Sequence, residues 1–461
     1  MIKLYNTLTN RKEEFKPQKG NEVSVYVCGI TPYDETHLGH ARAYVAFDII
    51  IRHLLNRGYG VKHVQNFTDV DDKIIKRAAE NGVSPLALAQ VYMDGYFTQM
   101  EKLNVLKAGQ YPRVTEMIAD IVSFVQKLID KGYAYETNGD VYFSVEKFKD
   151  YGKLSKRDLA DNRSGARVEV NEEKTNAFDF ALWKKTKENE PDETSWDSPW
   201  GKGRPGWHIE CSVMSSKLLG DTIDIHGGGQ DLIFPHHENE IAQSEAATEK
   251  QFVKYWIHNG FVTVNKEKMS KSAGNFFTLK EIFEKYSPRV VRYYLMTQHY
   301  KSPLDFSDSG LESAKNALQG LDDAYLRLCQ KVMKNEDIAD PDLIRLKNNF
   351  LESLDDDFNS EKALSYLHEL KNIILNELFA SDKRRLAQLK YLFESMFADS
   401  LGIILPKTQT DEDLQRLLDE RNAARAAKNW PEADRLRKII DAKGYKITDN
   451  PDGSSALTKK I

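Results

Sequence analysis

The sequence has only three cysteines, Cys28, Cys211 and Cys329, among its 461 residues. An odd number of cysteines excludes a complete disulfide framework and is typical of a reducing compartment. No run of 18 apolar residues occurs, and the N-terminus MIKLYNTLTNRKEEF lacks the apolar core of a signal peptide. We therefore expect a cytoplasmic protein with no membrane contact.

The chain also lacks an internal repeat, a low-complexity tract and an excess of positive charge. Its formal net charge of -5 does not by itself predict nucleic-acid binding, although it could hide a locally basic face. A chain of this length is too long for one compact core, and we expect about three domains.

The stretch VYVCGITPYDETHLGHAR predicts a strand, a turn and the start of a helix. The strand is predicted at Val23–Val27 and the helix at Ala41–Leu55. His37 and His40 then lie at the helix N-terminus, where unpaired N–H groups attract phosphate, and Gly39 lets a flat ligand approach the backbone. The alternative is that the two histidines only cap the helix.

The next segments predict a strand-helix-strand unit followed by an insertion. Val61–Phe67 alternates like a strand, and TDVDDK after it is typical of a helix N-cap with an acidic first turn rather than of catalytic carboxylates. Long amphipathic helices are predicted at Pro85–Leu106 and Val114–Lys131. Short strands and charged turns from 133 to about 200 predict an insertion whose aromatic residues pack a small core.

The α/β pattern resumes with GWHIEC at 206–211 and a strand at Thr222–His226. The glycine run after that strand predicts either a turn or a backbone that approaches a ligand, and Asp231 could bind ribose hydroxyls. A helix is predicted after Pro235, where both His236 and His237 share a face with Glu240.

Two cysteines, one of these histidines and Glu240 would make a ligand set that zinc accepts. Spacing does not choose between the two histidines, and Cys28 and Cys211 are far apart in sequence. Cys329 is expected to pack in a helix. Zinc is therefore a hypothesis at this point.

Three lysines crowd the loop NKEKMSKSAGNFF: Lys266, Lys268 and Lys271. Such a loop could hold a phosphate chain or could be a solvated turn.

HLGH together with KMSKS resembles the paired signature of class I aminoacyl-tRNA synthetases. Within that class the sequence is similar to the cysteinyl-tRNA synthetase family, through Cys28, TDVDDK, GWHIEC, DIHGGG and PHHENE in that order. The resemblance covers the whole chain. One departure is Leu38, where the family usually has isoleucine, and this swap is nearly isosteric.

The resemblance implies an α/β fold: a Rossmann-like parallel-sheet catalytic domain with an insertion, then a helical bundle and a small mixed C-terminal domain. The implied boundaries are 1–112 and 205–265 for the catalytic halves, 113–204 for the insertion, 266–310 for the KMSKS loop and stem-contact region, 311–405 for the anticodon-binding bundle and 406–461 for the C-terminal tRNA-binding domain.

The same resemblance implies roles for individual residues. One zinc ion per chain would be held by Cys28, Cys211, His236 and Glu240, which selects His236 over His237. ATP, with Mg²⁺, would be bound by His37, Gly39, His40, Asp231 and Lys271. The catalytic residues would be His37, His40, Lys268 and Lys271, and the amino acid would be enclosed by Thr68 and Trp207.

Near the C-terminus the local charge reverses. Residues 416–446 include nine basic and five acidic side chains, a net +4. Arg421, Arg425 and Lys428 share a predicted helical face just before Trp430, which is typical of an RNA-binding surface but also of a solvated helix. A hairpin is predicted from Tyr445 to Leu457.

The expected function is a cysteine-tRNA ligase that uses ATP, L-cysteine and cysteine tRNA as its partners. It would make cysteinyl-adenylate, transfer cysteine to the 3' end of the tRNA and act as a monomer. One alternative is a related ligase that passes cysteine to an amino sugar and needs less of the chain after Leu311. The other is a non-catalytic RNA-binding relative, against which the intact HLGH and KMSKS motifs argue.

Overall fold

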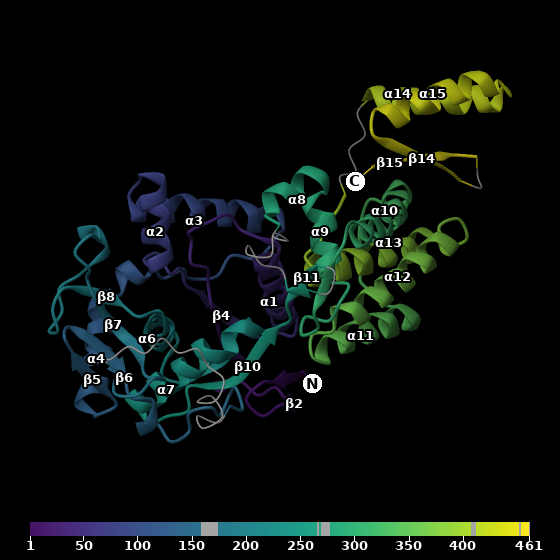
Figure 1. Cartoon of the computed structure of the whole chain (residues 1–461). Coiled ribbons are helices and arrows are strands. Elements are labelled where there is room, and N and C mark those ends of the chain that lie inside the picture. Colours follow the sequence, from purple (N-terminus) through teal and green to yellow (C-terminus); the bar gives the residue numbers. More distant parts are fainter. Residues whose placement is uncertain (158–173, 265–266, 269–276, 407–411, 451–452, 461) are drawn as a thin grey trace. The chain divides into compact units, whose positions relative to one another are not determined.

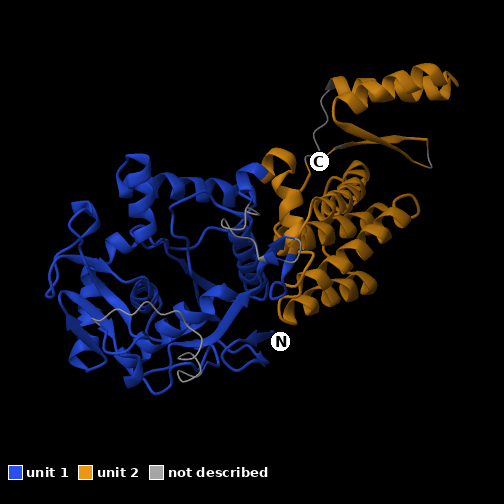
Figure 2. Ribbon diagram, in the orientation of Figure 1, with its two compact units in different colours: residues 1–281, 300–304 blue, residues 282–299, 305–461 orange. Residues whose placement is uncertain are grey.

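The computed structural model describes residues 1–157, 174–264, 267–268, 277–406, 412–450 and 453–460 (Figure 1). The chain divides into two compact units (Figure 2). The first is Met1–Glu281 with Tyr300–Leu304, and the second is Ile282–His299 with Asp305–Ile461. Among the described residues, no helix combines the length and the apolar character that a membrane crossing needs.

A four-stranded sheet in the order β10-β9-β3-β4 forms the centre of the first unit. Every neighbouring pair in it is parallel, and Val25 of β3 lies opposite both Ile225 and His63. Parallel strands must be joined by crossovers, which here are helical. The predicted α/β class is thus confirmed. The strands are β3 (Glu22–Val27), β4 (Gly60–Gln65), β9 (Ile223–Gly229) and β10 (Val253–Asn259).

Helix α1 (Leu38–Asn56) follows β3 and packs closely on β9. A side-chain carbon on Gly227 would lie 2.1 Å from the Phe47 ring of α1, so this close approach requires glycine. The glycine run pairs with residues 257–259 of β10 and so continues β9 as far as Gly229, whereas the strand was predicted to end at His226. Helix α1 begins three residues before the predicted start at Ala41.

The TDVDDK segment caps a helix, as predicted. Asp71 is the N-cap of α2 (Asp72–Asn81), and its carboxylate accepts the backbone N–H of Lys73 at 2.8 Å. Asp69 is buried instead, and it accepts hydrogen bonds from the backbone and hydroxyl of Thr115. The two carboxylates thus have structural roles in two different segments.

The insertion forms an antiparallel sheet in the order β5-β6-β7-β8. Trp183 is fully buried there, and its ring lies 5.9 Å from that of Trp200. These aromatic residues belong to the same buried cluster as Tyr26 and Cys28 of the central sheet. The predicted packing of the insertion's aromatic residues is confirmed, and their core is continuous with that of the central sheet. Its elements are α4 (Ile118–Asp130), β5 (Ala134–Thr137), β6 (Asp140–Phe143), β7 (Phe180–Lys185) and β8 (Gly203–Pro205).

Among its described residues, the first unit also contains helices α3, α6 and α7 and several short strands. The N-terminal strands β1 and β2 pair as an antiparallel hairpin, and β11 pairs with β12. The elements are β1 (Lys3–Asn6), β2 (Arg11–Glu14), α3 (Pro85–Lys102), α6 (Trp207–Leu219), α7 (Glu238–Thr248), β11 (Val262–Val264) and β12 (Glu267–Lys268).

The second unit is mostly helical, as the pattern from Leu311 onward predicts. The buried faces of its helices are lined by leucine and phenylalanine, such as Leu318, Phe350 and Leu367. The predicted C-terminal hairpin is also confirmed. The elements from 288 onward are α9 (Pro288–Leu295), β13 (Leu304–Phe306), α10 (Asp308–Lys331), α11 (Pro341–Asp355), α12 (Ser360–Glu377), α13 (Lys383–Glu394), α14 (Glu412–Ala426), α15 (Trp430–Ala442), β14 (Tyr445–Asp449) and β15 (Ser455–Lys459); α8 (Leu279–Lys285) precedes them.

Candidate active site

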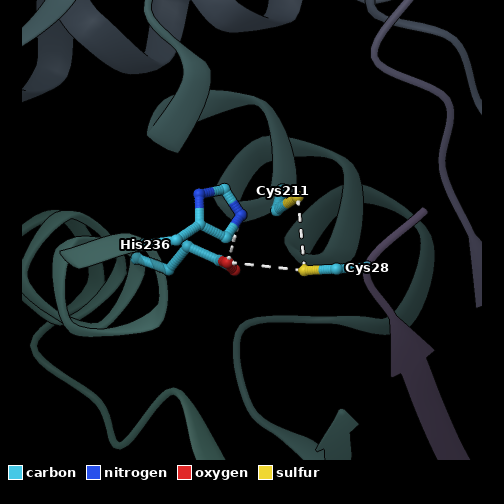
Figure 3. A group of neighbouring side chains, drawn as sticks. Cys28, Cys211 and His236 are labelled. Carbon is cyan, nitrogen blue, oxygen red and sulfur yellow. Dashed lines mark hydrogen bonds and ion pairs between the residues drawn. The ribbon is translucent and has the colours of Figure 1, made fainter. Parts of the chain in front are cut away.

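Four buried side chains meet at the carboxyl end of the central sheet, and we call them the four-ligand cluster (Figure 3). Their ligand atoms all lie within 4.8 Å of one another. One comes from the residue after β3, one from α6, one from the turn before α7 and one from α7 itself. The members are Cys28, Cys211, His236 and Glu240.

Two distances in the four-ligand cluster match those expected around a tetrahedral metal ion. Zinc bonds of about 2.3 Å to sulfur and about 2.1 Å to oxygen place two sulfurs about 3.8 Å apart, and a sulfur and an oxygen about 3.6 Å apart. The Sγ atoms of Cys28 and Cys211 are 3.9 Å apart, and Cys28 Sγ lies 3.8 Å from Glu240 Oε1. The donor set of two sulfurs, one nitrogen and one oxygen is also one that zinc accepts.

A second set of possible ligands overlaps the first. It shares Cys28 and Glu240 but replaces the other two members by His226 and His237. His226 Nε2 lies 2.8 Å from Glu240 Oε2, whereas Cys28 and His236 both face the other carboxylate oxygen, Oε1. His226 therefore fits better as a hydrogen-bond partner of the carboxylate than as a metal ligand.

Neighbouring histidines orient the ligands. His208 Nδ1 lies 3.0 Å from His236 Nδ1, which leaves His236 Nε2 directed at Glu240, also at 3.0 Å. His226 engages the other carboxylate oxygen of Glu240. Such outer contacts set the orientation of metal ligands. Sequence reasoning missed His208 and His226, although both lie inside the motifs GWHIEC and DIHGGG.

The electrostatics of the cluster favour a bound cation. The hydrogen bond with Cys28 lowers the pKa of the Cys211 thiol to about 6. Burial opposes ionisation of Glu240, but His226 and His236 lower its pKa to about 2. Burial opposes the charge on His236, but Glu240 raises the pKa of this imidazole to about 10. Without a metal the cluster thus holds a thiolate, a carboxylate and one imidazolium at neutral pH, and a cation would offset the remaining negative charge.

His37 and His40 form the N-terminal cap of α1. His37 Nδ1 accepts hydrogen bonds from the backbone N–H groups of Gly39 and His40, at 3.1 and 3.4 Å. The two imidazole rings stack with their centroids 3.6 Å apart. The histidines therefore cap the helix, which was the alternative predicted from the sequence. Two of the N–H groups that were expected to attract phosphate already donate to His37. A role in binding ATP stays a prediction.

The other residues predicted to bind substrates occupy different environments. Thr68 is buried, and its hydroxyl donates to Glu210 Oε2 at 2.6 Å. Trp207 is 37% exposed, and its ring stacks on His236 with the centroids 4.3 Å apart, so it covers the four-ligand cluster. Asp231 is exposed in a short turn (Gln230–Leu232) directly after β9. Their roles as substrate ligands stay predictions.

The lysine loop falls mainly on residues that the structure leaves out. Lys266 and Lys271 lie outside the described residues. Lys268 ends β12, whose backbone pairs with Thr263 of β11. The predicted catalytic roles of Lys268 and Lys271 are untested by the geometry.

The predicted basic face near the C-terminus needs correction. Arg421 is only 3% exposed, and its guanidinium donates two hydrogen bonds to Asp449, at 2.6 and 2.9 Å. Arg425 also contacts Asp449, at 2.5 Å. Lys428 lies beyond the end of α14 with a positive φ of 57°, so it does not share that helix face. Arg421 thus joins α14 to the hairpin, while Lys428 and Trp430 remain exposed.

Two family models match the sequence. The model described as "tRNA synthetases class I (C) catalytic domain" matches residues 14–316, and the DALR domain model matches residues 349–405. The first of these covers more than half of the chain, including every member of the four-ligand cluster.

Curated relatives match over nearly the full length. A cysteine–tRNA ligase from Endomicrobium trichonymphae is 70% identical over 100% of both chains. Cysteine–tRNA ligases from Geobacillus sp. (strain WCH70) and Thermococcus onnurineus (strain NA1) are each 48% identical, over 98% of this chain and 98% of theirs.

Solved structures share the fold. The methionyl-tRNA synthetase of Mycobacterium tuberculosis in complex with methionyl-adenylate matches with a TM-score of 0.59 and 17% identity, over 83% of this chain and 90% of that one. A LeuRS–tRNA–LeuAMS complex from Agrobacterium radiobacter matches with a TM-score of 0.58 and 12% identity, over 84% and 85%. At these identities the likeness shows the fold alone.

Proposed function

Because the chain belongs to the cysteine–tRNA ligase family of class I tRNA synthetases, we propose that its four-ligand cluster holds one zinc ion that selects cysteine. The enzyme activates cysteine with ATP and transfers it to tRNA. Its match to ligases extends through the region after Leu311, which favours tRNA over the amino-sugar alternative as the acceptor. The family also argues against a non-catalytic RNA-binding protein.

The observation that carries the zinc proposal is the buried donor set of two sulfurs, one nitrogen and one oxygen. When bound, zinc would take the substrate sulfur as a thiolate, because a metal deprotonates a thiol whose free pKa is about 8.5. Serine differs only by oxygen for sulfur, and shape alone discriminates such a pair poorly. Selection would then occur at binding, and the insertion would need no hydrolytic activity.

Within the chain, we propose that Trp207 and Thr68 enclose the amino acid. Trp207 stacks on His236 at the exposed side of the cluster, where it would exclude water from the bound side chain. The hydroxyl of Thr68 is held by Glu210, so its position is defined before substrate arrives. Such preorganisation lowers the cost of orienting the substrate.

ATP and its Mg²⁺ would bind at the start of α1 and beside β9. The proposed ATP-binding residues are His37, Gly39, His40, Asp231 and Lys271, and Lys268 joins Lys271 and the two histidines as a catalytic residue. Activation needs no protein nucleophile, because the cysteine carboxylate attacks the α-phosphorus directly. Positive groups would stabilise the charge that develops on phosphorus.

We propose that the tRNA is bound by the helical bundle, here taken as 311–405, and by the C-terminal domain, 406–461. The DALR match at 349–405 supports the first of these. On the C-terminal domain the exposed Lys428 and Trp430 could contact phosphate and an unstacked base, with Arg425 beside them. The enzyme would act as a monomer on cysteine tRNA.

Metal analysis and X-ray absorption test the zinc proposal. We expect one zinc per chain with two sulfur neighbours, and one further sulfur after cysteine is added. A zinc with a single protein sulfur would support the alternative set with His226 and His237. A folded protein that binds cysteine equally tightly without metal would overturn the proposal.

Three serine variants sharpen this test, because the chain offers a matched control. Cys28→Ser and Cys211→Ser should each lose zinc and cysteine affinity together. Cys329→Ser, on α10 and outside the cluster, should keep both. Cysteine-dependent pyrophosphate exchange, measured with and without tRNA as acceptor, then separates activation from transfer.

A further inference from the structure

A hydrogen-bonded chain leads from the four-ligand cluster to the N-terminal hairpin. His237 Nε2 lies 3.3 Å from Cys28 Sγ, and His237 Nδ1 lies 2.8 Å from His258 Nε2. His258 Nδ1 in turn lies 2.8 Å from the hydroxyl oxygen of Thr7, just after β1. Both imidazole rings are buried, at 0 and 4% exposure.

When Cys28 is a thiolate, the hydrogen bonds between Cys28, His237, His258 and Thr7 can be donated in only one direction, toward the sulfur. A thiolate can only accept, so the ring nitrogen that faces it must carry a proton. The two contacts of 2.8 Å each need one donor and one acceptor, and a ring with a single N–H donates at one nitrogen and accepts at the other. His237 Nδ1 must then accept from His258 Nε2, and His258 Nδ1 must accept from a donor.

The hydroxyl of Thr7 is that donor. We propose that Thr7 is a positioning residue for the four-ligand cluster: its hydroxyl donates to His258 and so orients, through two rings, an N–H toward the sulfur of Cys28. This inference rests on the proposed metal site, because a metal is what keeps Cys28 ionised. Hydrogen bonds to a coordinated ligand tune both its orientation and its strength as a donor.

The hairpin holds Thr7 in place for this contact. The backbone N–H of Thr7 donates to the carbonyl of Trp256 on β10, at 2.9 Å. The side chain of Asn6 donates to Lys254 O and accepts from Trp256 N, at 2.9 and 3.0 Å. Three bonds thus dock the end of β1 on β10, two residues from His258, so the hydroxyl meets a preformed acceptor.

Removal of the hydroxyl should leave the tautomers undetermined. With valine at position 7, either His258 Nδ1 is a buried acceptor without a donor, or both rings reverse and His237 turns a lone pair toward the Cys28 sulfur. Both outcomes leave a polar group unpaired in the interior, which is unfavourable. The loss should appear at the metal, although Thr7 touches none of its ligands.

The experiment compares Thr7→Val, Thr7→Ser and Thr9→Val in the full chain. Thr9 is an exposed threonine in the same turn whose hydroxyl donates to Asn6 O, so its variant is a matched control. Zinc affinity is measured by competition with a chelator, and cobalt-substituted protein reports the thiolates through its sulfur-to-metal absorption band. We expect Thr7→Val to weaken zinc about tenfold and to shift the cobalt band, while Thr7→Ser and Thr9→Val match the wild type.

The outcomes separate this inference from the metal proposal. If the wild type binds no stoichiometric metal, both are overturned. If the wild type and Thr7→Val bind zinc equally and give the same cobalt spectrum, only the role of Thr7 is overturned. If Thr7→Ser loses as much affinity as Thr7→Val, packing and not the hydroxyl is responsible, which also overturns it. Thermal unfolding of each variant shows that the comparison is made on folded protein.

Discussion

Replacement of Gly29 by alanine should displace Cys28 and disrupt the four-ligand cluster. The new side-chain carbon would lie 1.5 Å from the backbone oxygen of Asn66, whereas real contacts of this kind stay above 3.0 Å. The ends of β3 and β4 must therefore separate by about 1.5 Å. The atom in conflict belongs to the backbone, so no side-chain rotation can relieve it.

Cys28 has no freedom to absorb that movement. Its N–H donates to Gly227 O at 3.0 Å, its carbonyl accepts from Tyr44 at 3.2 Å, and Gly29 N donates to the Asn66 side chain at 2.9 Å. Metal–ligand distances tolerate changes of only about 0.2 Å. A misplacement of about 1 Å at a reaction site costs about a hundredfold in rate. Overpacking also destabilises the fold by about 1–3 kcal/mol.

The assay measures zinc per chain, the midpoint of thermal unfolding and cysteine-dependent pyrophosphate exchange. We expect Gly29→Ala to stay folded, to lose zinc and to lose about a hundredfold or more of its exchange rate. The control is Gly60→Ala at the start of β4, where an added carbon meets no atom within 4 Å. Wild-type zinc content and exchange in Gly29→Ala would refute the reasoning, because the contact with Asn66 would then be yielding.

Three further predictions concern other parts of the chain. Lys271→Ala should slow adenylate formation about a hundredfold, because the loss of one such donor costs about 3 kcal/mol, and it should leave cysteine binding intact. Normal single-turnover kinetics would remove Lys271 from the mechanism. Replacement of Lys428 and Trp430 by alanine should weaken tRNA binding and reduce its salt slope by about one unit for the phosphate contact, and unchanged affinity at moderate salt would make this surface merely solvated. The hydrogen bond from Arg421 lowers the pKa of Asp449 to about 2. The ionised carboxylate therefore stabilises the fold fully above the unfolded pKa of about 3.9, and this stabilisation is lost as pH falls through about 2. An NMR titration should find that low pKa in the wild type and a higher one in Arg421→Met, still below about 3.9 because Arg425 remains beside the carboxylate.

Much of the local structure could be predicted because it depends on neighbours in the chain. The β-branched run before Cys28 and the helical spacing after Ala41 predicted β3 and α1 to within a few residues. The acidic cap of α2 was predicted for the same reason, since a carboxylate at an N-cap bonds the N–H groups next to it. The motifs also predicted the family, which the relatives confirm.

Predictions that depended on which residues are buried matched the structure less well. Helical spacing placed Arg421 on one face with Arg425, but it carried no information about the hairpin that covers this face. Asp449, 28 residues farther along, turns Arg421 into a buried structural residue. Likewise, the glycine run after His226 was predicted to be a turn or a ligand contact, but it continues a strand because it pairs with residues 257–259 of β10, and Phe47 leaves no room for a side chain at Gly227.

By itself, therefore, the sequence determined the fold class, the motifs and the family, because these depend on local conformation and on the order of residues along the chain. Tertiary structure decided which distant groups meet. It brought the sulfur of Cys28 to within 3.9 Å of that of Cys211, 183 residues farther along the sequence. It also placed His226 within hydrogen-bond distance of Glu240, and Thr7 within hydrogen-bond distance of His258. Hydrogen bonds and metal coordination act over about 2–4 Å, a scale that spacing in sequence does not specify and that the packing of strands and helices does.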